Sequence, residues 1–184
     1  LTQDDVGISG WSIESRVYAE DPFRGFVPST GRLLRFRPPV ESATVRVDTG
    51  VSEGGEVTMH YDPMVAKLIT YGPDRKRATA AMCRALDRFQ LKGIQSNIPF
   101  LAALVMHPRF VAGDLTTGFI EEEYPEGFAA ARPSDLTVCR IAALVAVIHE
   151  HWRTREQFGS ANQRSTSVRH VRINDAQHAV QVCR

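Results

Sequence analysis

The chain has 184 residues, of which 43% are hydrophobic and 23% are charged, and its formal net charge at pH 7 is +1. This composition is typical of globular proteins and excludes wholesale disorder, while the near-neutral charge gives no electrostatic reason to expect nucleic acid or an anionic membrane as a partner. The longest apolar run, residues 141–148, is much shorter than the roughly 20 residues that a membrane-spanning helix needs.

Residues 12–19 are predicted to form the first β-strand. Their side chains alternate between apolar and polar, which is the period-2 pattern of a strand with one buried face. The apolar face comprises Ile13, Val17 and Ala19, and the polar face comprises Glu14, Arg16 and Tyr18. Proline cannot donate to a strand ladder, so Asp21 and Pro22 end this strand.

Four further strands are expected, over residues 33–36, 44–51, 56–61 and 65–71. Gly54 and Gly55 allow a tight reversal from the second of these strands into the third. Residues 65–71 fit a strand or a short helix, and their β-favouring residues Ile69, Thr70 and Tyr71 favour the strand.

The period then changes to that of a helix. Asp74 is a suitable N-cap, and the residues after it repeat at spacings of three and four, as on one face of a helix: Ala78, Met82, Ala85, Leu86 and Phe89. A second helix, capped by Ser96 or Asn97, is expected to end before Pro108. A short helix is expected over residues 117–124. Strands followed by helices indicate an α+β domain.

A second domain is expected after a linker at residues 129–134. It begins with a long helix over residues 135–156, followed by a polar loop at 159–166 and by two strands, 168–173 and 178–182, that flank a turn at 174–177. One helix and one hairpin cannot bury a core alone. We therefore predict a first domain over residues 1–128 and an incomplete second domain over residues 129–184.

The cysteines indicate the redox compartment of the chain, and its first residue suggests that it is part of a longer protein. Cys83, Cys139 and Cys183 are an odd number without C-x-x-C spacing, so we expect a reducing cytoplasm rather than a disulfide framework or a zinc site. The chain begins at Leu1 rather than at methionine and shows no secretory leader. We expect it to be a piece of a larger soluble enzyme.

Most signatures of catalysis are absent from the sequence. No phosphate-binding G-x-x-x-x-G-K-[ST] loop occurs, and His149 and His151 lie on different sides of their expected helix, so they cannot share a metal ion. We therefore expect no metal site in the chain. The run 121–123 of three glutamates is best explained as a solvated helix face.

A polar cluster at strand positions remains. Glu14 and Arg16 project from one face of the first strand, and Tyr61 and Asp62 end the expected strand before Pro63. These residues could line a cleft for a small ligand with an anionic or carbonyl oxygen, to which the forked guanidinium would donate. Alternatively, they form a structural ion pair at a sheet edge. The residues alone leave both interpretations open.

Three ordered motifs carry a family resemblance. Residues 13–22, 28–31 and 61–69 strongly resemble the C-terminal domain of biotin carboxylase, and shorter matches at residues 74–75, 93–94 and 97–98 continue it over roughly residues 1–128. The resemblance implies an antiparallel sheet with packed helices. Residues 119–128 are similar to the α subunits of propionyl-CoA carboxylases. The helix and hairpin beyond Asp135 resemble the start of the domain that docks this subunit onto its carboxyltransferase partner.

This resemblance implies a reaction and its cofactors. The family uses ATP and magnesium to join bicarbonate to biotin on a carrier domain, and a carboxyltransferase β subunit passes the carboxyl group to an acyl-CoA. The resemblance implies that Arg16 is catalytic and stabilises negative charge on the ureido oxygen of biotin. Tyr61 and Asp62 match the walls of the same site, and Arg46 matches a position that some members use in dimer contacts. Ser15 replaces a family cysteine on the opposite face of the strand.

The resemblance also implies that functional parts of the subunit lie outside this chain. The family's ATP-binding region and its biotin-bearing lysine match no residues here, so the chain is expected to bind neither ATP nor metal and to be inactive alone. One alternative is a docking module without a direct catalytic role, and another is the same piece of an acetyl-CoA or methylcrotonyl-CoA carboxylase. An unrelated, self-sufficient enzyme is a third. The expected location is the bacterial cytoplasm or, in a eukaryote, the mitochondrial matrix.

Overall fold

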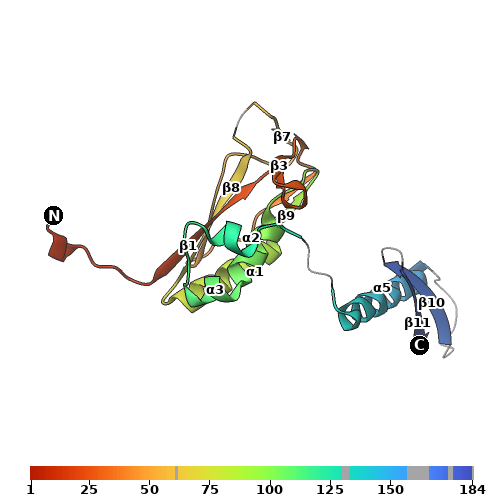
Figure 1. Ribbon diagram of the computed structural model, residues 1–184. Coiled ribbons are helices and arrows are strands. Elements are labelled where there is room, and N and C mark those ends of the chain that lie inside the picture. Colours follow the sequence, from red (N-terminus) through yellow and green to blue (C-terminus); the bar gives the residue numbers. More distant parts are fainter. Residues whose placement is uncertain (61, 130–132, 157–165, 174–175, 184) are drawn as a thin grey trace. The chain divides into compact units, whose positions relative to one another are not determined.

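The computed structural model describes residues 1–60, 62–129, 133–156, 166–173 and 176–183. The chain divides into two compact units, Leu1–Ala130 and Ala131–Arg184, and each is described by itself. Figure 1 shows the strands and helices of the first unit, and the helix α5 (Asp135–Glu156) and the hairpin of β10 (Thr166–Ile173) and β11 (Ala176–Cys183) in the second.

A three-stranded antiparallel sheet forms the centre of the first unit. Its strands are β1 (Trp11–Tyr18), β8 (Met64–Gly72) and β6 (Val45–Thr49), and β8 lies between the other two. From Ile13 in β1 and from Ala66 in β8, every second residue is buried, as period-2 alternation requires when one face of a sheet is covered. The structure therefore confirms the strands expected at these three places.

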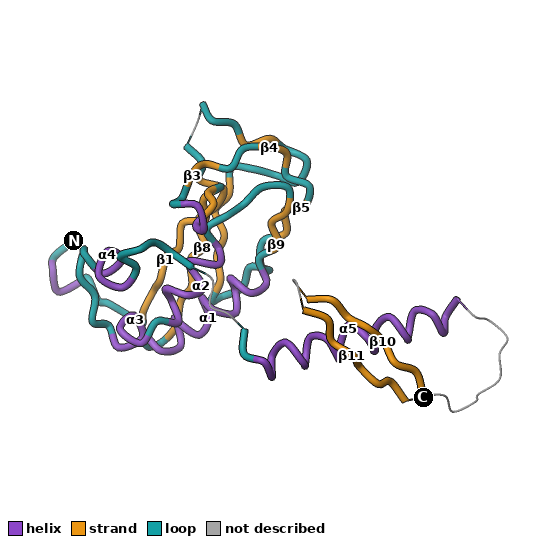
Figure 2. Tube along the Cα trace, turned by 45° about the vertical axis from the view of Figure 1, so that its right-hand side comes forward, coloured by secondary structure: helices purple, strands orange, loops and turns teal. Residues whose placement is uncertain are grey.

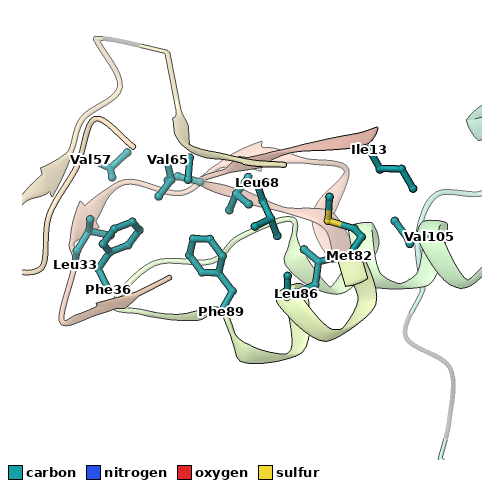
Figure 3. Packing of buried hydrophobic residues seen from close by; sticks show 14 of the residues in the cluster. Ile13, Leu33, Phe36, Val57, Val65, Leu68, Met82, Leu86, Phe89 and Val105 are labelled. Carbon is teal, nitrogen blue, oxygen red and sulfur yellow. The ribbon is translucent and has the colours of Figure 1, made fainter. Parts of the chain in front are cut away.

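Helix α1 (Arg75–Arg88) covers the inner face of this sheet (Figure 1). Asp74 caps it as predicted, since Oδ1 accepts a hydrogen bond from the backbone N–H of Arg77 at 2.8 Å. In Figure 3, Leu68 of β8 points toward Met82 and Leu86 of α1. Burial of this shared apolar surface is the main force that holds the helix on the sheet.

Short strands extend the first unit around the sheet (Figure 2). They form three antiparallel pairs: β2 (Glu20–Asp21) with β3 (Val27–Pro28), β4 (Gly31–Arg32) with β7 (Glu56–Val57), and β5 (Arg35–Arg37) with β9 (Gln90–Lys92). One-turn 3-10 helices lie at Gln3–Asp5 and Pro22–Arg24. Strand β9 was not expected, because a strand of two or three residues shows no measurable period.

Two expectations for this region were wrong. The strand expected at residues 33–36 is found only from Arg35, because Leu33 and a bend at Leu34 separate β4 from β5. The reversal at Gly54 and Gly55 does not pair its flanking strands. Instead, Gly54 donates to the Leu33 carbonyl at 2.8 Å, and Leu33 donates to the Gly55 carbonyl at 2.9 Å. As a result β7 pairs with β4, and it stops at Val57 rather than continuing to residue 61.

Three helices complete the first unit: α2 (Ile98–Met106), α3 (Pro108–Ala112) and α4 (Phe119–Glu123). The structure confirms α2 and α4. Helix α3 was missed because Pro108 was interpreted only as a stop, although proline is also favoured in the first turn of a helix. Arg109 of α3 binds α4 through Nη1, which lies 2.8 Å from Glu122 Oε2 and 2.6 Å from Glu123 Oε1.

The second unit consists of α5 (Asp135–Glu156) and the antiparallel hairpin of β10 (Thr166–Ile173) and β11 (Ala176–Cys183). Its small buried core contains Ala142, Ala146 and Val171. The expected helix and strands are confirmed. The predicted loop at 159–166 and turn at 174–177 lie largely outside the described residues, and so does the middle of the predicted linker.

Candidate functional site

The two faces of β1 have different roles. Ile13, Ser15 and Val17 face the core, and Ser15 is only 5% exposed. Glu14 and Arg16 face outward. Ser15 therefore lies on the opposite face from Arg16, as the alternation predicted, and cannot contact a ligand bound over the outer face.

Arg16 and Glu14 form an ion pair on this outer face. Nε of Arg16 donates to Oε1 of Glu14 at 3.1 Å, and 58% of the Arg16 side chain remains exposed. The hydrogen bond to Glu14, followed by a hydrogen bond with the Tyr18 side chain, raises the pKa of Arg16. The guanidinium is therefore a permanent cation that faces outward from a rigid strand.

Strand pairing extends this outer face across the sheet. Arg16 lies opposite Lys67 on β8, and Lys67 lies opposite Asp48 on β6. Arg46 lies on the same face, where its Nε and Nη2 donate to the two oxygens of Asp48, each at 2.8 Å. The structure therefore places two predicted site residues, Arg16 and Arg46, on one charged face that also includes Lys67.

Asp62 lies near the end of β1, next to Glu20. Its Oδ1 accepts a hydrogen bond from the Met64 N–H at 3.0 Å, and Met64 pairs with Tyr18. Burial, together with the negative charge of Asp62, raises the pKa of Glu20. Tyr61, the other predicted wall residue, lies outside the described residues.

Asn97 contacts the site and was not predicted to do so. Its side chain hydrogen-bonds to the backbone of Arg16 and of Tyr18, which lie 81 and 79 positions earlier in the chain. A sequence pattern shows only local neighbours, and locally Asn97 is a suitable helix cap. No local signal could have shown its contacts with β1.

The described residues show neither a membrane span nor a metal cluster. None of their helices is both long and apolar enough to cross a bilayer. Within the same residues, no group of at least three His, Cys, Asp or Glu side chains is arranged to hold a metal ion.

Comparison with known protein families shows the family to which the first unit is related. The family model described as "Biotin carboxylase C-terminal domain" matches residues 14–122, which include β1 from Glu14 onward, β8 and Asn97. The chain belongs to the biotin carboxylase C-terminal domain family. Its first unit accordingly has the biotin carboxylase C-terminal fold, with antiparallel sheets and a few helices.

Two relatives of the family extend the match beyond the first unit. The chain is 50% identical over 168 residues to the propionyl-CoA carboxylase α chain of Ruegeria pomeroyi, which covers 81% of this chain and 25% of that protein. It is 42% identical over 171 residues to the mitochondrial propionyl-CoA carboxylase α chain of Caenorhabditis elegans. This match covers 91% of this chain and 24% of that protein. The chain thus spans about a quarter of the length of these relatives.

A solved structure shares the fold of the first unit. The biotin carboxylase domain of Hydrogenobacter thermophilus 2-oxoglutarate carboxylase, in complex with MgADP and bicarbonate, superimposes with a TM-score of 0.67. It is 36% identical in sequence, and the match covers 72% of this chain and 29% of that one.

Proposed function

We propose that this chain forms one wall of the biotin site in the biotin carboxylase subunit of an acyl-CoA carboxylase. The observation that carries the proposal is the charged, outward-facing guanidinium of Arg16, held by Glu14 on the rigid strand β1 within the residues that match the family. Asp62, two residues before β8, and Tyr61 before it are proposed as further walls of the site.

Arg16 has the chemistry that biotin carboxylation needs. When biotin loses its ureido proton, negative charge develops on the ureido oxygen. A fixed guanidinium donates hydrogen bonds to that oxygen and stabilises the charge without losing its own proton. Because Glu14 binds Nε, we assign the terminal nitrogens of Arg16 to the biotin oxygen. ATP and magnesium, which activate bicarbonate, are proposed to bind elsewhere in the subunit, and the chain alone is proposed to be inactive.

The test is Arg16→Ala in the complete subunit. We expect carboxylation of free biotin to fall by about 10²–10³-fold, the usual effect of removing an oxyanion-stabilising donor. The melting temperature should change little because the side chain is mostly exposed. Arg37→Ala, which removes another exposed arginine, on β5, is the control and should leave turnover unchanged. Unchanged turnover in Arg16→Ala would refute the assigned role.

The second unit supports a second function, which is subunit assembly. Helix α5 exposes several large apolar side chains, which are Leu136, Ile141, Leu144, Val145, Val147, Ile148 and Trp152. Exposed apolar surface of this kind marks interaction sites. We propose that residues 129–184 begin the domain that docks this subunit onto a carboxyltransferase β subunit. In the alternative, docking is the only role of the chain.

The acyl-CoA is proposed to be propionyl-CoA. The matches to propionyl-CoA carboxylase α chains cover 81% and 91% of this chain, well beyond the residues that the family model matches. Acetyl-CoA and methylcrotonyl-CoA remain the alternatives.

Arg46, on the same outer face as Arg16, is proposed as a dimer contact. The proposed location is the cytoplasm of a bacterium or the mitochondrial matrix of a eukaryote.

A further inference from the structure

Asn97 binds the free edge of β1 beside Arg16. Strand β1 is terminal in its sheet and pairs with β8 on one edge. On the other edge, Nδ2 of Asn97 donates to the Arg16 carbonyl at 3.1 Å, and Oδ1 accepts from the Tyr18 N–H at 2.9 Å. The Asn97 N–H also donates to the Tyr18 carbonyl at 3.1 Å. One residue thus supplies hydrogen bonds that a neighbouring strand would otherwise make.

The side chain of Asn97 serves β1 instead of its own helix. Asn97 occupies the N-cap position of α2, where an asparagine side chain commonly accepts a hydrogen bond from the helix backbone. Its side chain makes no such bond here. The residue is only 6% exposed, and both polar atoms of its amide bind β1. This local arrangement favours a role on the strand over a role in capping.

The contacts of Asn97 lie where β1 faces an irregularity in the neighbouring strand β8. The register between β1 and β8 shifts between Val17 and Tyr18, so the two residues that Asn97 binds, Arg16 and Tyr18, lie on either side of the shift. From Val17 to Tyr18, β1 advances by one residue while β8 passes from Ala66 to Met64, so Val65 of β8 is the extra residue and the ladder that holds β1 is disrupted there. Because the pairing with β8 is irregular here, the direction in which the Arg16 side chain leaves β1 depends on the hydrogen bonds that Asn97 makes on the other edge.

We propose that Asn97 is a positioning residue for Arg16, because it fixes the β1 backbone on both sides of the register shift and so directs the guanidinium toward biotin. The inference rests on the proposed function, in which Arg16 contacts biotin. Asn97 acts only through Arg16 and touches no reacting atom. A displacement of about 1 Å in a catalytic group can lower a rate by about 10²-fold, so a small backbone shift is sufficient for a large effect.

The experiment uses Asn97→Asp in the complete subunit, with free biotin as the substrate. Aspartate has the same shape and keeps an acceptor for the Tyr18 N–H, but it places an oxygen against the Arg16 carbonyl where Nδ2 donated. We expect kcat for biotin carboxylation to fall by about 10–100-fold. ATP hydrolysis measured without biotin should stay within about two-fold, because that reaction does not use Arg16 in the proposed role.

Thr70→Val is the matched control for lost stability. It removes another buried hydrogen bond of the same sheet, from Thr70 Oγ1 to the Ala78 carbonyl at 3.1 Å, near the opposite end of β1 from Arg16. Its melting temperature should fall, while its carboxylation of biotin should stay within about two-fold of the unmodified subunit. Asn97→Ala, which removes both side-chain bonds, is the second variant.

A double variant separates positioning from a purely structural role. If Asn97 acts through Arg16, adding Asn97→Asp to Arg16→Ala should cause no further loss of kcat. Additive losses, normal kcat in Asn97→Asp, or failure of both Asn97 variants to fold while Thr70→Val folds would each overturn the proposal. If Arg16→Ala itself has normal turnover, the proposed function is wrong and the inference falls with it. If only the Asn97 variants behave normally, the inference alone is wrong.

Discussion

Glu14 and Arg16 are two positions apart on the same face of β1, with the buried Ser15 between them. Exposed ion pairs of this kind contribute little to stability because water screens them. The pair is better explained as an orienting contact, since the Glu14 carboxylate accepts a hydrogen bond from Nε and so restrains the Arg16 side chain. The carboxylate also raises the pKa of Arg16, which keeps it charged throughout the physiological range.

The substitution Glu14→Gln tests whether Glu14 orients Arg16. The amide keeps the shape of the side chain but weakens the charge-assisted hydrogen bond to Arg16. In the complete subunit we expect carboxylation of free biotin to fall by about ten-fold, because the guanidinium becomes less well oriented. Glu56→Gln, an exposed residue of β7, should have no effect in the same kinetic assay. Equal turnover in both variants would show that Glu14 does not orient Arg16.

Two residues of the site show how far sequence patterns reach. The alternation in β1 placed Arg16 on the outer face, but the pattern alone favoured a structural ion pair, and only the family resemblance assigned a catalytic role to Arg16. Asn97 was interpreted as a helix cap. Its contacts with Arg16 and Tyr18 depend on how α2 packs beside β1, which is a long-range property of the fold.

At the scale of elements, long regular segments were predictable. Strands β1 and β8 and helix α1 each repeat their apolar positions several times, so the period identifies them. The short strands β4, β7 and β9 are too short to show a periodic pattern. They form because a segment distant in the sequence pairs with each of them through backbone hydrogen bonds. The prediction that the turn at Gly54 joins two paired strands was wrong for the same reason. Gly54 hydrogen-bonds to Leu33, which lies far from it in the sequence, and not to the preceding strand.

The turn after β9 provides a prediction about stability. Gly93 has a φ of +106°, and a Cβ there would lie 2.8 Å from the backbone nitrogen of Leu34. Gly93→Ala should lower the free energy of unfolding by at least about 1–3 kcal/mol, the usual cost of such backbone strain. Urea unfolding of this chain measures it. Gly50→Ala is the control, because a Cβ at Gly50 meets nothing within 4 Å, and equal effects of the two substitutions would contradict the explanation.

At the scale of the whole molecule, the two units differ in how much core they bury. The first has an extended cluster between sheet and helices, whereas the buried cluster of the second is small. The second unit also contains an ion pair in which Arg169 Nε donates to Oε2 of the buried Glu150 at 3.0 Å. Its exposed apolar helix is consistent with a surface that another protein or further chain covers.

Removal of residues 129–184 from the complete subunit tests the docking role. We expect the subunit to lose co-purification with its carboxyltransferase partner, because the exposed apolar side chains of α5 are removed. Carboxylation of free biotin should remain within about two-fold, since Arg16, Glu14 and Asn97 all lie in the first unit. Retention of an intact complex after the deletion would refute the docking role.

The alternation along β1 also has a consequence for how this protein tolerates change during evolution. Odd-numbered positions from Ile13 to Val17 face the core, while Glu14 and Arg16 between them face the proposed ligand. Conservative exchanges at the inner positions therefore adjust stability, and exchanges at the outer positions adjust chemistry. A single-residue insertion before Glu14 would exchange the two sets and bury the guanidinium. We expect natural variation in this strand to consist of substitutions, with insertions and deletions excluded.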